Sequence, residues 1–356
     1  MTITEEKVLE KLSGVMDPEL HRDLVSLGMI KNIAIDKNNV SVVVELTTPA
    51  CPLKDKIRAD VNQALESLDG VKDIKIEMTG KVRTDGLKRD LMTSPVKNVI
   101  AVASGKGGVG KSTLSVNIAI SLAQTGAKVG LLDADIYGPN IPTMMGVKEL
   151  PFSDGDKIIP AEAYGVKFMS IGFLVKHGQA LIWRGPMLHS AIQQFLRDVD
   201  WGELDYLVVD LPPGTGDAQL SLAQSISISG GVIVTLPQQV SLEDAERGMQ
   251  MFMQLNIPIL GVVENMSYLA LPDGTQMDIF GRGGGEKLAL KMQVPFIGAI
   301  PMETDVRLGG DLGIPIVISN PESGAAAAMR AIASEVAAKL SVSSMTKNQI
   351  EINITE

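Results

Sequence analysis

Hydrophobic positions in the first part of the chain follow short and mixed patterns. Residues 5–14 place Val8, Leu9 and Leu12 on one face, and residues 57–68 repeat apolar positions at helical spacing, so both segments predict helices. Residues 40–46 are rich in β-branched side chains, and residues 71–78 alternate apolar with charged positions, which predicts strands. The pattern therefore predicts a small α+β domain over residues 1–80.

Farther along, the apolar runs become nearly continuous and alternate with helical stretches. The runs cover residues 98–104, 128–133, 205–210, 231–236, 259–264 and 296–300. Continuous apolar strands separated by helices are typical of a parallel sheet covered on both faces. We therefore expect an α/β domain with a doubly wound parallel sheet over residues 98–340, and its last helix over residues 324–340.

Two segments lack any such pattern. Residues 81–97 are polar and charged without a period, which predicts a linker between the two domains. Residues 341–356 are polar, and we expect them to form a loose tail.

Composition narrows the class of protein. The 356 residues carry a net charge of -10, which does not favour long-range attraction to nucleic acid or to an anionic membrane surface. The sequence contains no long uncharged apolar run, and its start lacks a secretion signal, so we expect a cytoplasmic protein. Cys51 is the one cysteine, which excludes a disulfide within the chain.

A phosphate-binding motif follows the first apolar run of the large domain. The strand VIAVAS leads into GKGGVGKST at residues 105–113, and a helical stretch follows, which is the context of a P-loop. The glycines let backbone N–H groups face phosphate, Lys111 would reach the terminal phosphates and Ser112 would ligate Mg²⁺. The nucleotide-binding residues predicted here and below are Gly105, Lys106, Gly107, Gly108, Val109, Gly110, Lys111, Ser112, Thr113, Asp210 and Asn265.

Lys106 adds a second lysine inside this loop. The pattern K-G-G-x-G-K resembles the deviant Walker A group, which implies that this lysine reaches across a dimer to the nucleotide of the other subunit. A cation supplied in this way would neutralise charge that develops during phosphoryl transfer. The alternative is a solvated loop charge.

Three carboxylates come at the ends of apolar strands, where ligands bind in such folds. Asp133 and Asp210 would hold Mg²⁺ together with Ser112, and Asp210 is followed by LPPGTGD, which is typical of a switch loop. Asp135 would orient the attacking water, and its alternative role is a helix N-cap. The predicted catalytic residues are therefore Lys106, Lys111 and Asp135.

The nucleotide base is expected to be adenine. A guanine-reading N-K-x-D segment is absent, and Asn265, after an apolar strand, offers both a donor and an acceptor to a purine edge. Asn265 could equally close a turn.

The motifs GKGGVGKST, DADIYGPN, IWRGPM, DYLVVDLPPGTGD and VVENMSY together resemble the Mrp/ApbC family of iron-sulfur cluster carrier ATPases, relatives of MinD and ParA. The first domain resembles the MIP18-like domain, with D-P-E at residues 17–19 and T-T-P-A-C-P at residues 47–52. This resemblance implies a homodimeric ATPase that delivers iron-sulfur clusters to apoprotein clients. The D-P-E segment has a plainer interpretation as a capped turn.

One departure from that family bears on function. Many members place a C-x-x-C pair after E-N-M-S-Y, whereas this chain has LALPDGTQMDIFG at residues 269–281. Cys51 is then the candidate cluster ligand, with a small buried side chain as its alternative role. Two rival functions stay open, a cluster-free adaptor gated by nucleotide and a ParA/MinD-type partition or positioning ATPase.

Overall fold

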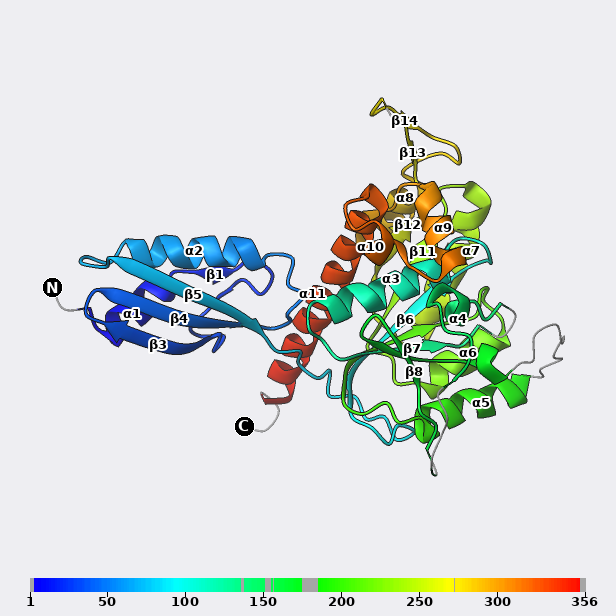
Figure 1. Cartoon of the computed structure of the whole chain (residues 1–356), viewed down its shortest axis with the longest axis horizontal. Coiled ribbons are helices and arrows are strands. Elements are labelled where there is room, and N and C mark those ends of the chain that lie inside the picture. Colours follow the sequence, from blue (N-terminus) through cyan, green and yellow to red (C-terminus); the bar gives the residue numbers. More distant parts are fainter. Residues whose placement is uncertain are drawn as a thin grey trace. The chain divides into compact units, whose positions relative to one another are not determined.

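The computed structural model describes residues 3–135, 138–150, 155, 157–174, 185–271 and 273–352, and the chain forms two compact units (Figure 1). Unit 1 comprises Met1–Arg83 and Ala337–Glu356, and unit 2 comprises Thr84–Val336. Among the described residues, no helix combines the length and the apolar composition needed to cross a bilayer.

Unit 1 contains a three-stranded sheet and two helices. Its elements are α1 (Glu5–Leu12), β1 (Met16–Asp17), β2 (Arg22–Asp23), β3 (Ile30–Asp36), β4 (Asn39–Leu46), α2 (Lys54–Glu66) and β5 (Asp73–Gly80). Strand β4 lies in the centre, antiparallel to β3 and parallel to β5. The helices α1 and α2 and the strands β4 and β5 were predicted. Strand β3 was not, because a register shift between Ile30 and Asn32 breaks the alternation of its side chains.

The core of unit 1 forms from one face of β4 and one face of each helix. Val40, Val42 and Val44 alternate along β4 and are buried, as expected for a strand with one face on a core. The helices add buried residues at helical spacing, namely Val8, Leu12, Ile57, Val61 and Leu65. Each such side chain contributes about 1.5–3 kcal/mol when it leaves water, so this small core stabilises the unit.

Unit 2 is built on an eight-stranded sheet with the order β15-β12-β11-β6-β10-β7-β9-β8. Its strands are β6 (Val96–Ser104), β7 (Val129–Asp133), β8 (Ala161–Ala163), β9 (Val166–Ser170), β10 (Leu204–Asp210), β11 (Gly230–Thr235), β12 (Ile259–Glu264) and β15 (Phe296–Ala299). All neighbours pair in parallel except β8, which runs antiparallel to β9. The six predicted strands are confirmed, whereas β8 and β9 were missed because they are short and lie at the edge.

Helices cover this sheet, and its central strands are buried along their whole length. The described helices are α3 (Lys111–Gln124), α4 (Ile141–Met144), η1 (Ile171–Leu174), α5 (Gly185–Asp198), α6 (Asp217–Ser225), α7 (Gln239–Gln254), α8 (Gly284–Lys291), α9 (Thr304–Leu312) and α10 (Ile316–Ser319). Every residue of β7 and β11 is buried, which requires cover on both faces. The prediction of a doubly wound α/β sheet is confirmed. A small hairpin of β13 (Leu269–Ala270) and β14 (Gln276–Met277) follows β12.

The last helix is longer than the sequence predicted. Helix α11 spans Gly324–Ile352 and does not end at Leu340. The residues after Leu340 are polar, but they contain no glycine or proline, so nothing in them ends a helix. Ser341 and Ser344 are buried, and Met345 packs against the core of unit 1. The prediction that the helix ends at Leu340 and that a loose tail follows is therefore wrong, because it relied on the polarity of the residues alone.

The segment predicted as a linker carries a buried ion pair within unit 2. Arg89 pairs with Asp85 at 2.5 Å between Nη2 and Oδ2, and both side chains are only 6% exposed. The same guanidinium donates to the carbonyl oxygens of Val96 and Ser227, at 3.1 Å each, and to Ser229 Oγ at 3.0 Å. These bonds attach the segment to the start of β6 and to the chain that leads into β11.

Candidate functional site

The phosphate loop lies between β6 and α3, as the motif predicts. Strand β6 ends at Ser104, the loop occupies residues 105–110, and α3 begins at Lys111. Gly108 and Gly110 have φ angles of +81° and +88°, a conformation that side chains disfavour. Gly107 and Gly108 are exposed, so their backbone N–H groups remain accessible to an anion.

Two glycines of the loop are required by packing. A Cβ on Gly105 would lie 2.1 Å from the carbonyl carbon of Asp244 in α7. A Cβ on Gly110 would lie 2.1 Å from Nδ2 of Asn265. The sequence analysis assigned these glycines to phosphate access alone, but the structure shows that they also let α7 and the end of β12 approach the loop.

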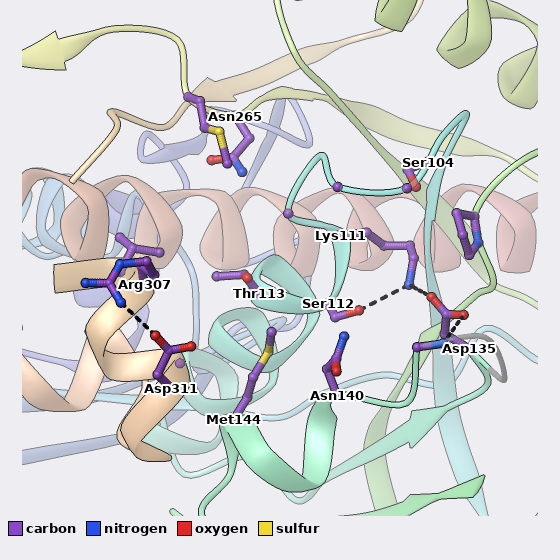
Figure 2. A pocket seen from close by; sticks show the side chains of 18 of the residues that line it. Ser104, Lys111, Ser112, Thr113, Asp135, Asn140, Met144, Asn265, Arg307 and Asp311 are labelled. Atoms are coloured by element: carbon purple, nitrogen blue, oxygen red, sulfur yellow. Dashed lines mark hydrogen bonds and ion pairs between the residues drawn. The ribbon is translucent and has the colours of Figure 1, made fainter. Parts of the chain in front are cut away.

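Lys111 joins the phosphate loop to the carboxylates at the ends of β7 and β10. Its Nζ lies 2.7 Å from Oδ2 of Asp210. It lies 3.4 Å from Oδ2 of Asp135, a pair that Figure 2 shows. Burial alone would lower the pKa of Lys111, but Asp210 and Asp135 outweigh it and the pKa is raised. Ser112 Oγ donates to the same Asp210 oxygen at 2.6 Å. Lys111, Ser112 and Asp210 therefore meet at one point and bind one another.

Asp133 lies beneath this cluster. Its side chain is fully buried, its Oδ2 accepts a bond of 2.7 Å from Ser170 Oγ, and its Oδ1 accepts one of 3.2 Å from the Asp135 N–H. Burial, reinforced by the charge of Asp210, raises the pKa of Asp133 to about 8. Asp133 was predicted to hold Mg²⁺ together with Asp210 and Ser112. Like Asp210, it is fully buried and is not among the residues that line the cavity described below. Its bonds support Asp135.

Asp135 and Lys106 both face the cavity. Burial raises the pKa of Asp135, although Lys111 opposes this shift. Asp135 Oδ1 accepts a bond of 3.3 Å from the Gly138 N–H, so it also closes a local turn. Lys106 is half-buried, and its backbone carbonyl accepts a bond of 2.9 Å from Ser104 Oγ. This bond ties the backbone of Lys106, in the lining of the cavity, to the end of β6.

Asn265 connects β12 to the loop. Its Nδ2 donates to the carbonyl oxygen of Val109 at 2.8 Å, and its own N–H donates to Thr235 O at 2.8 Å. Asn265 is 8% exposed and lines the cavity, which leaves its Oδ1 as the group that could accept from a base.

One cavity of about 780 Å³ is lined by Lys106, Lys111, Ser112, Asp135 and Asn265. Asp133 and Asp210 are fully buried and are not among its lining residues. In Figure 2, Lys111 and Asp135 lie at one end of the cavity and the ion pair of Arg307 with Asp311 lies at the other. Apolar side chains of Met144, Met302 and Val306 contribute to its wall. The volume suits a nucleotide-sized ligand. The lining comprises Ser104, Lys106, Gly107, Gly108, Gly110, Lys111, Ser112, Thr113, Asp135, Gly138, Asn140, Thr143, Met144, Pro213, Asn265, Met266, Pro301, Met302, Glu303, Val306, Arg307, Gly310 and Asp311.

The sequence analysis missed the part of this wall that comes from α4, α9 and the loop before α9. These residues form no motif, and they reach the cavity because α4 packs against α9. At that contact Gly146 and Gly313 approach so closely that a Cβ on Gly313 would lie 2.4 Å from Gly146 Cα. Single glycines at the ends of two helices give no signal of this contact in the sequence.

Cys51 belongs to unit 1, apart from the residues of this cavity. It is half-buried and packs against the core of unit 1, at the turn where Thr48 Oγ1 accepts a bond of 3.2 Å from the Ala50 N–H. In the D-P-E segment, Asp17 Oδ1 accepts bonds of 2.9 Å from the N–H groups of Glu19 and Leu20, which confirms the capped turn. Within the described ranges, no group of three or more His, Cys, Asp or Glu side chains is arranged to hold a metal ion.

The sheet, the phosphate loop and the paired lysine and carboxylate define a P-loop NTPase. A family model described as NUBPL iron-transfer P-loop NTPase matches residues 95–337, and one described as iron-sulfur cluster assembly protein matches residues 5–78. The chain belongs to the family of iron-transfer P-loop NTPases, as its motifs predicted.

Relatives of known name agree with this assignment. The iron-sulfur cluster carrier protein of Synechocystis is 50% identical over 351 residues, which cover 96% of this chain and 99% of that protein. The nucleotide-binding protein of Archaeoglobus fulgidus, solved in complex with ADP, is 41% identical with a TM-score of 0.55, over 61% of this chain and 87% of that one. The cell division ATPase MinD of Pyrococcus furiosus, at 23% identity and a TM-score of 0.51, covers 67% of this chain and 98% of its own, and shares the fold.

Proposed function

We propose that this chain is a homodimeric, Mg²⁺-dependent ATPase that carries iron-sulfur clusters to apoproteins in the cytoplasm. The observation that carries the nucleotide part is that Lys111 and Ser112, which line a nucleotide-sized cavity, both bind the buried Asp210. The family models, which both concern iron-sulfur or iron transfer, support the carrier part.

Different residues of the site bind the phosphates, the metal ion and the attacking water. The N–H groups of residues 105–113 and the ammonium of Lys111 receive the phosphates, for which Lys111 leaves Asp210. Ser112 Oγ and the Asp210 carboxylate are hard oxygen donors and fit Mg²⁺, which would neutralise phosphate charge. Asp135 orients the attacking water, and Asp133 holds the Asp135 N–H from below.

Lys106 completes the site from the other subunit. Its position at the mouth of the cavity lets its side chain extend to a neighbouring nucleotide when two copies close together. A cation delivered in this way stabilises the charge of the transition state, so hydrolysis depends on dimerisation. Asn265 selects adenine, because its Oδ1 accepts from the 6-amino group of adenine, whereas guanine presents an oxygen there.

The chain has few thiols with which to hold an iron-sulfur cluster. Cys51 is the one cysteine of the sequence, so a dimer offers two thiolates. A cluster needs more ligands than that, and we propose that small thiols or the client protein supply the rest. The same count favours a second candidate, a nucleotide-gated adaptor that binds client proteins without a cluster.

Anaerobic reconstitution with iron and sulfide separates these two functions. Wild type and Cys51→Ser are compared by visible absorbance and by transfer to an apo-ferredoxin, with and without ATP. We expect a cluster that transfers from wild type and is lost in Cys51→Ser. Wild type without a transferable cluster would leave the adaptor, and an equal cluster in both proteins would exclude Cys51 as a ligand.

A further inference from the structure

The carboxylate of Asp210 is held by three side chains of the described structure. Lys111 Nζ and Ser112 Oγ lie 2.7 Å and 2.6 Å from Oδ2, and Ser115 Oγ lies 2.6 Å from Oδ1. Asp210 and Ser115 are both 0% exposed. The sequence analysis assigned no role to Ser115, because it stands within an apolar helical stretch after the motif.

Two of these three partners are required elsewhere when nucleotide binds. Under the proposed function, on which this inference rests, Lys111 turns to phosphate and Ser112 turns to Mg²⁺. Ser115, like Asp210, is absent from the lining of the cavity, whereas Lys111 and Ser112 belong to it. Ser115 contacts Oδ1 of Asp210, and the two lining residues contact Oδ2. Ser115 is then the partner that keeps Asp210 in place.

A serine inside a helix often bonds to the carbonyl one turn earlier, which would make Ser115 a simple helix residue. Its Oγ does lie 3.0 Å from the carbonyl oxygen of Lys111. A hydroxyl has a single proton, however, and the carboxylate oxygen is both nearer, at 2.6 Å, and charged. The geometry therefore favours donation to Asp210.

We propose that Ser115 is a positioning residue for the Mg²⁺ site. By donating to Oδ1 it fixes the rotation of the Asp210 carboxylate, so that Oδ2 keeps facing Ser112 after Lys111 has left. Its contribution is then specific to the binding of Mg²⁺ with nucleotide and does not extend to nucleotide alone.

The test measures the affinity of a fluorescent ATP analogue in EDTA and in Mg²⁺, for wild type and three variants. Ser115→Ala removes the hydroxyl, and Ser115→Thr retains it. Ser121→Ala is the matched control, because Ser121 is a buried serine of the same helix, 5% exposed, whose Oγ has no hydrogen-bond partner among the described residues.

We expect Ser115→Ala to bind the analogue in EDTA within about twofold of wild type, while the gain in affinity from Mg²⁺ falls by at least about tenfold, as for loss of a bond to a charged group. Ser121→Ala and Ser115→Thr should keep the wild-type gain, even if the extra methyl of threonine lowers the melting temperature.

Three results would overturn the inference: an unchanged Mg²⁺ gain in Ser115→Ala, an equal loss of affinity in EDTA, or a folded Ser115→Thr that behaves like Ser115→Ala. If Ser115→Ala does not fold, Ser115→Cys takes its place, because a thiol is only a weak donor and should also lose most of the Mg²⁺ gain. A wild type that binds the analogue but gains nothing from Mg²⁺ removes the inference and the Mg²⁺ site together, and one that binds no analogue removes the proposed function itself.

Discussion

Replacing Lys111 with alanine removes a buried ammonium group from between two carboxylates. Lys111 is 5% exposed, and its Nζ lies 2.7 Å from Asp210 and 3.4 Å from Asp135. The variant leaves both carboxylates buried without this countercharge. Removing one partner of a buried ion pair costs about 3–5 kcal/mol. We therefore expect Lys111→Ala to destabilise unit 2 before any nucleotide is added.

Thermal unfolding of the nucleotide-free chain measures this cost. Tryptophan fluorescence follows unit 2, because both tryptophans, Trp183 and Trp201, belong to its sequence range. In a domain of this size about 1 kcal/mol shifts the melting temperature by roughly 2–4 °C, so we expect a fall of about 10 °C near neutral pH. Lys97→Ala is the control, since its pair with Asp205 has an Nζ–Oδ1 distance of 2.7 Å but a lysine that is 39% exposed. That pair should contribute about 1 kcal/mol or less.

The pH dependence separates lost charge from lost packing. Burial already raises the pKa of Asp135, and that of Asp133 to about 8. A carboxyl with a raised pKa binds its proton more tightly in the folded state, so unfolding releases protons and stability increases as pH falls. Without Lys111 this effect grows, and the deficit in melting temperature should shrink between about pH 8 and about pH 5. If Lys111→Ala melts at the same temperature as wild type near pH 8, or if its deficit does not change with pH, the electrostatic account is refuted.

Three further substitutions test other parts of unit 2. Under the proposed cross-dimer role, Lys106→Ala should leave ATP binding intact but slow phosphate release, because the transition state would lose a cation from the other subunit. Unchanged hydrolysis would contradict that role. Arg89→Ala leaves Asp85 buried without its partner and should lower the free energy of unfolding, measured with denaturant, by about 3–5 kcal/mol; a change near zero would show that the segment is a free linker. Gln219 is 1% exposed, and its side-chain amide has no hydrogen-bond partner in the described structure, so Gln219→Leu should raise stability by about 1–2 kcal/mol. A lower melting temperature would instead reveal a bond that this amide makes.

The parts of the site that could be predicted are those written in contiguous residues. The phosphate loop follows directly on a buried strand and leads directly into the helix that begins with Lys111 and Ser112. The local sequence is therefore enough to predict this part of the site. Asp210 was predictable because it ends a continuous apolar run. Strands, loops and carboxylates of this kind can be predicted without knowledge of tertiary packing.

The missed features depend on contacts between distant residues. Ser115 lies in an apolar helical stretch, and its partner Asp210 follows 95 residues later in sequence. Arg89 stands in a polar stretch that looks like a linker, and its burial depends on Asp85 together with Ser229, which is 140 residues away. Hydrophobic patterning identifies buried apolar side chains, but it cannot detect a buried polar side chain whose hydrogen-bond partner lies far away in the sequence.

The pairing of Lys111 with Asp210 also explains why nucleotide and Mg²⁺ should bind together under the proposed function. In the structure the ammonium and the Ser112 hydroxyl satisfy the Asp210 carboxylate. A triphosphate that binds alone would take Lys111 away and place more negative charge beside a buried carboxylate, which is unfavourable. A divalent cation held by Ser112 and Asp210 would supply the lost countercharge. The ion pair of Lys111 with Asp210 therefore opposes binding of nucleotide without its metal.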